Sequence, residues 1–342
     1  MHFRILTALL ALLTLAACAA RGPQADAGSF QHDVTTAARP WTDEAFDAAP
    51  DKFTFALFSD LTGGERAGVF EVAVEQLRLL RPELIVNVGD LIEGGTTDRE
   101  QLTREWDAFD ERARRANAPV FYAGGNHDLT NPEMWDVWDE RYGRRDYHFV
   151  YRDVLFLVLD TEDNTTEAQW RLHEIRDEAI AAVEAEGWDA FMDTEYGRSP
   201  ERRYGRIGER QQGYFLDVIA ENADVRHTFV LLHKPIWERD GEASFAAIER
   251  ALATRRYTVF YGHEHDYQYD IRNGRDYIGL GTTGGVQNTS KAMAVDHVTL
   301  VTVSPDGVDI ANLKLSGIFG KDGRIPAGGE TLCFEARVCG DQ

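Results

Sequence analysis

Five apolar runs in this sequence are each followed within a few residues by side chains that can bind a metal or transfer a proton. The runs are residues 53–58, 84–88, 119–122, 228–232 and 258–261. The segments that follow them are Ser59-Asp60, Gly89-Asp90, Gly125-Asn126-His127-Asp128, His233 and Gly262-His263-Glu264-His265. Ligands of open α/β sheets bind beyond the carboxyl ends of the strands. We therefore expect these side chains to converge on one site, because five scattered surface residues would not fall in this register.

The donor types in this set suit divalent transition metals. Carboxylate oxygen, amide oxygen and imidazole nitrogen form a mixed set typical of Mn, Fe, Zn or Co, and too rich in nitrogen for Ca or Mg. No cysteine falls in these motifs, which excludes a structural zinc knuckle. Two adjacent metals would lower the pKa of a shared water and hold the attacking and leaving oxygens of an in-line displacement.

The order of these motifs resembles that of the calcineurin-like metallophosphoesterases. Their pattern is Asp-x-His, Gly-Asp, Gly-Asn-His-Asp/Glu, a lone His and Gly-His-x-His, and the resemblance covers about residues 53 to 312. It implies an α/β fold of two packed mixed β-sheets flanked by helices, in four layers αββα. It also implies two divalent transition metals, with Asp90 as the bridging ligand. The remaining ligands would be Asp60 and His265 for the first metal, and Asn126, His233 and His263 for the second.

The resemblance also implies the reaction, which is hydrolysis of a phosphate ester. A metal-bound hydroxide would attack phosphorus, and His127 would act as the general acid that protonates the leaving oxygen, oriented by Asp128. Gly-Asn-His-Asp is seen more in diesterases and Gly-Asn-His-Glu more in protein phosphatases. We therefore expect a small phosphodiester or a nucleotide as the substrate, and no nucleic-acid duplex as a partner.

The first motif departs from the family pattern, because Thr62 stands where the family has histidine. A neutral hydroxyl is a poor transition-metal ligand beside imidazole, so we expect the first metal to bind more weakly than the second. Nearby acids that could replace the ligand are Glu65, Glu93 and Glu264. The departure leaves an alternative open, namely a catalytically impaired metallophosphoesterase-fold binding protein of the cell envelope.

The elements that must position these residues follow an alternating β/α pattern, which is typical of an α/β core. Helical spacing of apolar residues begins at Val69, and an Asn cap followed by Pro132 predicts a second helix start. Further helices are expected over 99–116, 167–186 and 208–222. Further strands are expected over 154–159, 277–280, 298–303 and 308–310, the last two as a hairpin.

Residues 161–206 are interpreted as an insertion in this pattern. Four arginines of the insertion and one that follows it could bind a phosphate, and these are Arg198, Arg202, Arg203, Arg206 and Arg210. The favoured interpretation is nevertheless a solvated, salt-bridged loop. Two further cations, Arg66 and Lys234, could reach a phosphate or be surface charges. An aromatic stripe could likewise stack on a ligand, but packing on the core is favoured; it consists of Met134, Trp135, Trp138 and Tyr142.

The N-terminus predicts export. A basic start, an apolar run and Leu15-Ala16-Ala17-Cys18 resemble a lipoprotein signal peptide over residues 1–18, with Cys18 lipidated. Residues 19–50 would form a flexible tether, 51–318 the metallophosphoesterase domain and 319–342 a tail. We expect an envelope location, on the outer membrane facing the periplasm, with membrane contact only through the lipid.

Length and composition are consistent with a globular chain that buries a substantial core. The 342-residue chain is 43% hydrophobic and has a formal net charge of −22, which argues against an anionic membrane surface or a nucleic acid as its partner. Apart from Cys18, the chain has only Cys333 and Cys339. In an oxidising compartment this pair is expected to form a disulfide.

Overall fold

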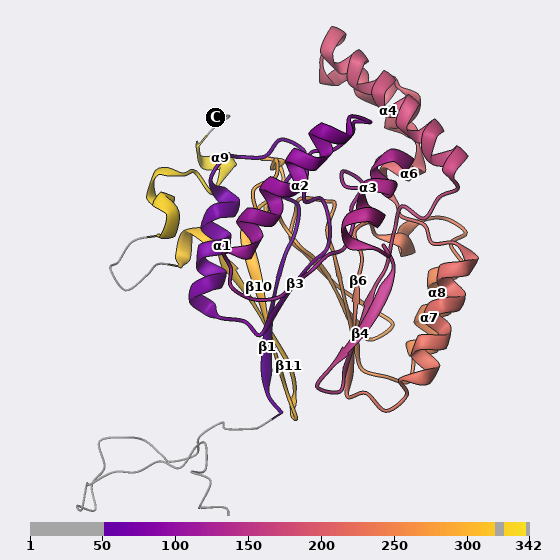
Figure 1. Ribbon diagram of the computed structural model, residues 1–342, viewed down its shortest axis with the longest axis vertical. Coiled ribbons are helices and arrows are strands. Elements are labelled where there is room, and N and C mark those ends of the chain that lie inside the picture. Colours follow the sequence, from indigo (N-terminus) through magenta and orange to yellow (C-terminus); the bar gives the residue numbers. More distant parts are fainter. Residues whose placement is uncertain (1–50, 319–324, 340–342) are drawn as a thin grey trace, which may run out of the picture. The chain divides into compact units, whose positions relative to one another are not determined.

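The computed structural model describes residues 51–318 and 325–339, and these form two β-sheets packed face to face (Figure 1). The first sheet has the strand order β11-β10-β1-β2-β3 and the second β4-β5-β6-β7-β9-β8. The strands of the first sheet are β1 (Phe53–Phe58), β2 (Leu84–Asn87), β3 (Val120–Phe121), β10 (His297–Ser304) and β11 (Gly307–Lys314). Those of the second are β4 (Tyr147–Tyr151), β5 (Val154–Val158), β6 (His227–Leu231), β7 (Tyr257–Tyr261), β8 (Gln268–Arg272) and β9 (Arg275–Gly279).

Helices cover the outer face of each sheet, as Figure 1 shows. The first sheet is covered by α1 (Val69–Leu80), α2 (Arg99–Arg114) and α3 (Pro132–Tyr142), and the second by α7 (Glu209–Glu221) and α8 (Ser244–Leu252). Between β5 and α7 lie α4 (Thr166–Glu186), η1 (Trp188–Asp193), α5 (Glu195–Arg198) and α6 (Pro200–Arg203). The short helices η2 (Ile236–Glu238), η3 (Leu315–Gly317), η4 (Pro326–Thr331) and α9 (Ala336–Cys339) complete the described elements.

The layers follow from the alternation of side chains along each strand. In β1, Phe55 and Leu57 point into the core between the sheets, whereas Ala56 and Phe58 pack under the helices. The rings of Phe55 and Phe229 meet edge to face across the two sheets, with centroids 4.9 Å apart. A strand buried on both faces, such as β5, is apolar throughout.

Both sheets are mixed, which confirms the expected fold class. In the first sheet, β1, β2 and β3 run parallel while β10 is antiparallel to β1. In the second, β5, β6, β7 and β9 run parallel, flanked by antiparallel β4 and β8. The carboxyl ends of the parallel strands therefore deliver their loops to one edge of each sheet.

Most expected elements are confirmed within a few residues. The Asn131 side chain accepts from Met134 N at 3.0 Å and caps α3 as predicted. The hairpin of β10 and β11 is also confirmed. Strands β4 and β8 and helix α8 were not predicted. Strand β8 lies at the edge of its sheet and leaves both Tyr269 and Ile271 exposed, so it lacks the run of buried apolar residues that marks the other strands.

The aromatic stripe on α3 belongs to the core, as the favoured interpretation predicts. Trp138 is fully buried, Met134 and Trp135 are nearly so, and Tyr142 packs against the same cluster. The Trp106 ring meets Trp138 edge to face with centroids 5.5 Å apart. These side chains hold α2 and α3 together and are not available to a ligand.

The signal peptide, Cys18 and the tether fall on residues 1–50, outside the described residues. No helix of residues 51–318 and 325–339 has the length and apolar character of a membrane span. Near the C-terminus, Cys333 and Cys339 are paired as a disulfide with Cα atoms 6.1 Å apart, a separation that suits the bond.

Candidate metal centre

Four of the residues at the strand ends adopt left-handed backbone conformations. The φ angles are 52° for Asp60, 58° for Asp90, 75° for His263 and 52° for His265. Such angles are uncommon for residues other than glycine, and each costs free energy. This cluster of strained positions, at the ends of β1, β2 and β7, indicates that the loops are held in place for a function.

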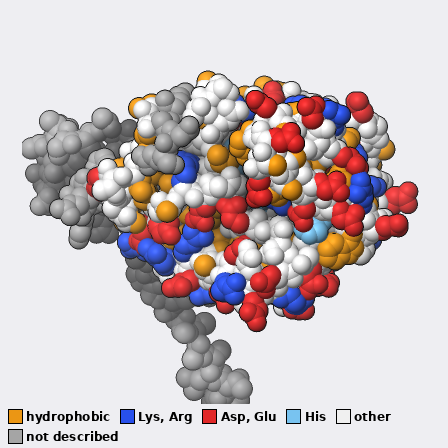
Figure 2. Space-filling view, turned by 90° about the horizontal axis from the view of Figure 1, so that it is seen from above, with side chains coloured by type: hydrophobic (Ala, Val, Ile, Leu, Met, Phe, Trp, Pro, Cys, Tyr) orange, Lys and Arg blue, Asp and Glu red, His pale blue; other side chains and the backbone are white. Residues whose placement is uncertain are grey.

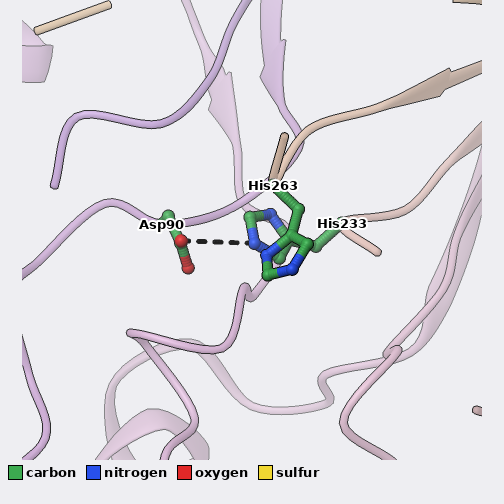
Figure 3. A group of neighbouring side chains, drawn as sticks. All are labelled: Asp90, His233 and His263. Carbon is green, nitrogen blue, oxygen red and sulfur yellow. Dashed lines mark ion pairs between the residues drawn. The ribbon is translucent and has the colours of Figure 1, made fainter. Parts of the chain in front are cut away.

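One group of potential ligands consists of Asp90, His233 and His263 (Figure 3). A ligand atom from each lies within 4.8 Å of the others. His233 Nε2 lies 3.2 Å from Asp90 Oδ2 and also 3.2 Å from Asn126 Oδ1. The structure therefore brings together all the residues that the sequence assigned to the second metal and its bridge.

A second group consists of Asp60, Asp90 and His265, again with ligand atoms within 4.8 Å of one another. His265 Nε2 lies 3.3 Å from Asp60 Oδ1. Asp90 belongs to both groups, so its carboxylate could serve two adjacent ions, as the resemblance implies. Both Asp60 and Asp90 are buried, so their charges require a cationic partner.

Backbone carbonyls fix the orientation of the three imidazole rings. His233 Nδ1 lies 2.8 Å from Val88 O, His263 Nε2 lies 2.9 Å from Arg202 O and His265 Nδ1 lies 2.5 Å from Val286 O. Metal-binding histidines commonly donate one ring N–H to such a carbonyl and bind the metal through the other nitrogen. The donor set thus fits two divalent transition ions.

The electrostatics of the site keep Asp90 ionised. Burial favours the neutral acid, but the charges of His233 and His127 and their hydrogen bonds hold the pKa of Asp90 well below its usual value. Burial and the charges of Lys234 and His233 hold the pKa of His263 well below its usual value. Asp90 and His263 therefore have the protonation states that metal binding requires. Burial favours neutral rings at His233 and His265 as well, but the charges and hydrogen bonds of Asp90 and Asp60 raise the pKa of His233 to about 9 and also raise the pKa of His265, so a metal must displace a proton from each ring.

A family model described as calcineurin-like phosphoesterase matches residues 53–267, which is more than half of the chain. The chain belongs to the calcineurin-like phosphoesterases. Together with the grouped aspartates and histidines, this makes it a metal-dependent phosphoester hydrolase. The resemblance seen in the motifs is thereby confirmed at the level of the family.

Solved structures support the fold assignment. A dimetal phosphatase from Danio rerio superposes with a TM-score of 0.52 at 16% identity, covering 77% of this chain and 96% of that one. GAP50, the anchor in the inner membrane complex of Plasmodium, gives a TM-score of 0.51 at 12% identity, covering 80% and 87% of the two chains. No curated protein sequence matches this phosphoesterase.

The proposed acid His127 faces the metal groups without belonging to them. Its backbone N–H donates to Asp90 Oδ1 at 2.9 Å, and its Nδ1 lies 2.9 Å from the carbonyl oxygen of Glu93. A Cβ built on Gly63 would lie 3.7 Å from His127 Nε2, and both residues line the cleft described below, so this nitrogen lies beside the cleft wall formed by Gly63. The ring is therefore held through Nδ1 by a backbone carbonyl and leaves Nε2 on the side of the cleft.

Asp128 does not have the partner that the sequence predicts. Its carboxylate accepts from the backbone N–H groups of Asp90, Leu91 and Ile92, and from Gly125, at 2.8 to 3.1 Å. Burial and the charge of Asp90 raise the pKa of Asp128 to about 7, against these donors. Asp128 thus shapes the loop that carries Asp90, and Glu93 replaces it as the residue that orients His127.

The position that departs from the family, Thr62, directs its side-chain hydrogen bond to a backbone carbonyl and not to a side chain of either metal group. Its side chain is fully buried and donates to the backbone carbonyl of Asp90 at 3.4 Å. The three nearby acids are engaged elsewhere. Glu93 accepts from the backbone of residues 63–65, Glu65 pairs with Arg112, and Glu264 lies 3.1 Å from Lys291. No described residue takes the place of the family's histidine.

The metal groups open into a cleft of about 660 Å³, a volume typical of small-molecule sites. One wall comes from the first motif and the His127 loop, including Gly63, Glu93 and His127. The opposite wall comes from the inserted segment 161–206, including Arg176, Trp188, Phe191 and Arg202. Arg176 and the aromatic residues were not singled out by the sequence analysis, because their place in the site depends on how α4 and η1 pack.

The arginines of the insertion divide between the two interpretations. Arg198 pairs with Asp193 at 2.6 Å and Arg210 with Asp146 at 2.7 Å, as expected for a salt-bridged loop. Arg202 and Arg203 line the cleft, and Arg203 also lies 3.8 Å from Glu238. Arg206 is exposed outside it.

The two other cations are structural. Arg66 pairs with buried Asp296 at 2.6 Å. Lys234 is buried, and its Nζ lies 2.8 Å from Glu162 Oε1 and 2.8 Å from the carbonyl oxygen of Glu201. Neither side chain lines the metal cleft. Figure 2 shows acidic side chains spread over one face of the molecule, in keeping with the net charge of −22.

Proposed function

We propose that this phosphoesterase hydrolyses small phosphodiesters or nucleotides, with His127 as general acid. The observation that carries the proposal is the sharing of Asp90 between two groups of potential ligands, with His127 bonded to Asp90 through its backbone N–H and lining the same cleft. The six residues proposed to bind metal are Asp60, Asp90, Asn126, His233, His263 and His265. When bound, divalent transition ions supply a water of lowered pKa and positive charge for the phosphate oxygens.

The protein residues then have distinct roles. Asp90 lies at the centre of the site, and its carboxylate is oriented by His233 and by the backbone N–H of His127. His127 Nε2 faces the cleft while Nδ1 is held by Glu93 O, so a proton on Nε2 is in position for the leaving oxygen. The cleft volume of about 660 Å³ lies in the range of small-molecule sites, which supports a nucleotide-sized substrate.

A direct test measures turnover of a p-nitrophenyl phosphodiester and a p-nitrophenyl monoester by the chain from residue 51 onward. Chelation is expected to abolish hydrolysis, and Mn, Co or Zn to restore it. Unchanged turnover of both esters in excess chelator would contradict the proposal. The ratio of the two rates decides between diesterase and monoesterase activity.

The alternative is a catalytically impaired binding protein on the same fold. The observation that favours it is Thr62, buried against the Asp90 carbonyl with no replacement ligand among the described residues. This alternative predicts binding of metal or phosphoester without turnover. Measurable turnover restored by metal would exclude it.

We propose further that the protein is a lipoprotein of the cell envelope, on the outer membrane facing the periplasm. The support is the N-terminal sequence, in which a basic start and an apolar run lead to Leu15-Ala16-Ala17-Cys18. The next residue, Ala19, is not an acid, which by resemblance to known lipoprotein sorting signals indicates the outer membrane. Cys18→Ser is expected to release the protein from the membrane fraction or leave its signal peptide uncleaved. A wild-type protein that starts elsewhere and partitions into water would overturn this.

A further inference from the structure

The inserted segment places in the metal cleft an arginine that has no partner among the residues the structure describes. Arg176 lies on α4, is partly buried, and makes no hydrogen bond or ion pair with any described residue. A buried or partly buried charge is normally paired. Other arginines of the insertion do have acidic partners, such as Arg171 with Glu195 at 2.7 Å.

The position of Arg176 is tied to the loop that holds His127. A Cβ built on Gly95 would lie 2.6 Å from Arg176 Nη1, so the absence of a side chain at this glycine makes space for the guanidinium. Two residues earlier, the carbonyl of Glu93 holds His127 Nδ1. The guanidinium is therefore near the proposed acid, where the oxygens of a phosphate would come.

A run of aromatic rings continues from this arginine along the same wall. The Trp188 and Phe191 ring centroids are 5.8 Å apart, and those of Phe191 and Tyr196 are 6.2 Å apart. The Arg202 guanidinium lies over the Phe191 ring at 5.7 Å, and its Nε donates to Gly197 O at 3.1 Å. This contact holds Phe191 beside the cleft.

The outer end of the aromatic run is open to solvent. Trp188 is 76% exposed, although exposing a tryptophan to water is unfavourable. Ile180 at 41% and Val286 at 49% are exposed beside the same cleft, Val286 on the opposite wall. An exposed apolar rim around a polar centre is typical of a ligand-binding groove.

We propose that the inserted segment selects phosphoesters that carry a planar aromatic group, as nucleotides do. Arg176 binds the non-bridging phosphate oxygens, and Trp188 with Phe191 stacks on the aromatic group of the same substrate. This rests on the proposed phosphoesterase function and adds the residues that choose the substrate. The charges are complementary, because Arg176 and Arg202 bring positive charge to a cleft in an acidic protein.

The test compares diesters that share one leaving group. A nucleoside p-nitrophenyl phosphodiester, methyl p-nitrophenyl phosphate and a long-chain alkyl p-nitrophenyl phosphodiester all release p-nitrophenolate. If the enzyme hydrolyses only monoesters, a nucleoside monophosphate and glycerol phosphate form the equivalent pair. The wild type is expected to favour the nucleoside ester in kcat/KM by about 5- to 150-fold, the range of one base stacking on one aromatic side chain.

Trp188→Ala should remove most of this preference by raising KM for the nucleoside ester, with kcat and the methyl ester unaffected. Trp170→Ala is the matched control, because Trp170 is a 37% exposed tryptophan of the same insertion that does not line the cleft. Arg176→Gln should lower kcat/KM for all esters by about 10- to 100-fold. Arg176→Lys should recover part of the loss, and Arg171→Gln should change nothing.

The outcomes distinguish failure of the aromatic selection from failure of the phosphoesterase function. Equal hydrolysis of nucleoside and methyl esters, or a preference for the alkyl chain, overturns the aromatic selection and leaves the phosphoesterase function intact. Persistence of the preference in the double variant Trp188→Ala/Phe191→Ala also overturns the aromatic selection. An enzyme that hydrolyses none of the esters with any of the metals contradicts the proposed function, and this inference with it.

Discussion

The Nε2 atom of His263 lies 2.9 Å from the carbonyl oxygen of Arg202, so the backbone of the inserted segment contacts a potential metal ligand. The insertion is fastened nearby by Lys234, which follows His233 in sequence. Lys234 Nζ lies 2.8 Å from Glu162 near the start of the insertion and 2.8 Å from the Glu201 carbonyl near its end. One buried lysine therefore connects both ends of the insertion to the metal centre.

Lys234→Met is expected to destabilise the protein strongly. Lys234 and Glu162 are both almost fully buried, and removal of the lysine leaves a buried carboxylate without its partner. Breaking such a pair costs about 3–5 kcal/mol. The measurement is the free energy of unfolding by urea.

Two further variants make this prediction specific. The double variant Lys234→Met/Glu162→Leu should be more stable than Lys234→Met alone, because no unpaired charge remains. Arg171→Met breaks an exposed pair with Glu195 in the same insertion and should cost at most about 1 kcal/mol. Equal losses from the buried and the exposed pair would show that Lys234 does not anchor the insertion.

Asp90→Ala is expected to remove both metals, because Asp90 belongs to both groups of potential ligands. Metal content per chain, measured by elemental analysis after dialysis, should fall towards zero. Asp136→Ala, at an exposed position on α3, is the control and should keep the wild-type content. Retention of one full metal in Asp90→Ala would mean that the two sites do not share this carboxylate.

His127→Ala is expected to lower kcat by roughly 10²- to 10⁴-fold while metal content stays unchanged. The reason is geometric, since His127 Nε2 faces the cleft but the residue is in neither ligand group. The loss should be smaller for esters with good leaving groups, which need less protonation. A variant that purifies without metal would instead make His127 a ligand.

The grouping of the candidate ligands could be predicted because the information for it is local. Asp60 and Asp90 follow parallel strands of the first sheet and His263 follows a parallel strand of the second, so each sheet delivers such positions to its own carboxyl edge. The partner of His127 was not predictable in the same way. Whether Asp128 or Glu93 holds the ring depends on the path of two loops, and the sequence shows only that both residues are nearby.

The same reasoning explains why the far wall of the cleft was missed. Arg176 and Trp188 have no motif around them, and their place in the site depends on how α4 and η1 dock on the core. The arginine-rich stretch was recognised, but sequence alone could not separate Arg202, which lines the cleft, from Arg198, which pairs with Asp193.

Asp160 is expected to make stability depend on pH. Burial is the main reason that its pKa rises to about 7 from an ordinary value near 3.8, although Arg145 lies 3.3 Å away. A carboxyl with a raised pKa favours the folded state most at low pH, and this contribution is lost as the pH rises from about 4 through 7. The shift corresponds to at most about 4 kcal/mol.

Asp160→Asn tests this. The free energy of unfolding of the variant relative to wild type should rise between about pH 4 and 7 and level off above, because the amide carries no charge to be buried. Taking the difference between the two proteins cancels the other titrating groups. Asp153→Asn, at an exposed position, should show no such trend. A flat difference for Asp160→Asn would mean that the buried carboxylate is ionised throughout this range.

Thr62 is expected to make the first metal site the weaker one. Without the family's histidine, this site has Asp60, Asp90 and His265 from the protein, and Thr62 donates its hydroxyl to a backbone carbonyl. Each protein ligand adds to affinity, so one metal should be lost first on dialysis, leaving a stoichiometry near one per chain. Titration with Mn, followed by calorimetry, should resolve a tight and a weak site.

Thr62→His should tighten the weak site and raise activity at limiting metal. Because Thr62 is fully buried, the larger ring is expected to be accommodated only towards the metal groups, beside Gly63. Thr62→Val is the matched control, since it has nearly the same volume and no hydroxyl, and should leave the weak site weak. Two sites that fill equally in the wild type, or a Thr62→His protein with unchanged stoichiometry and activity, would show that solvent or another residue already completes the first site.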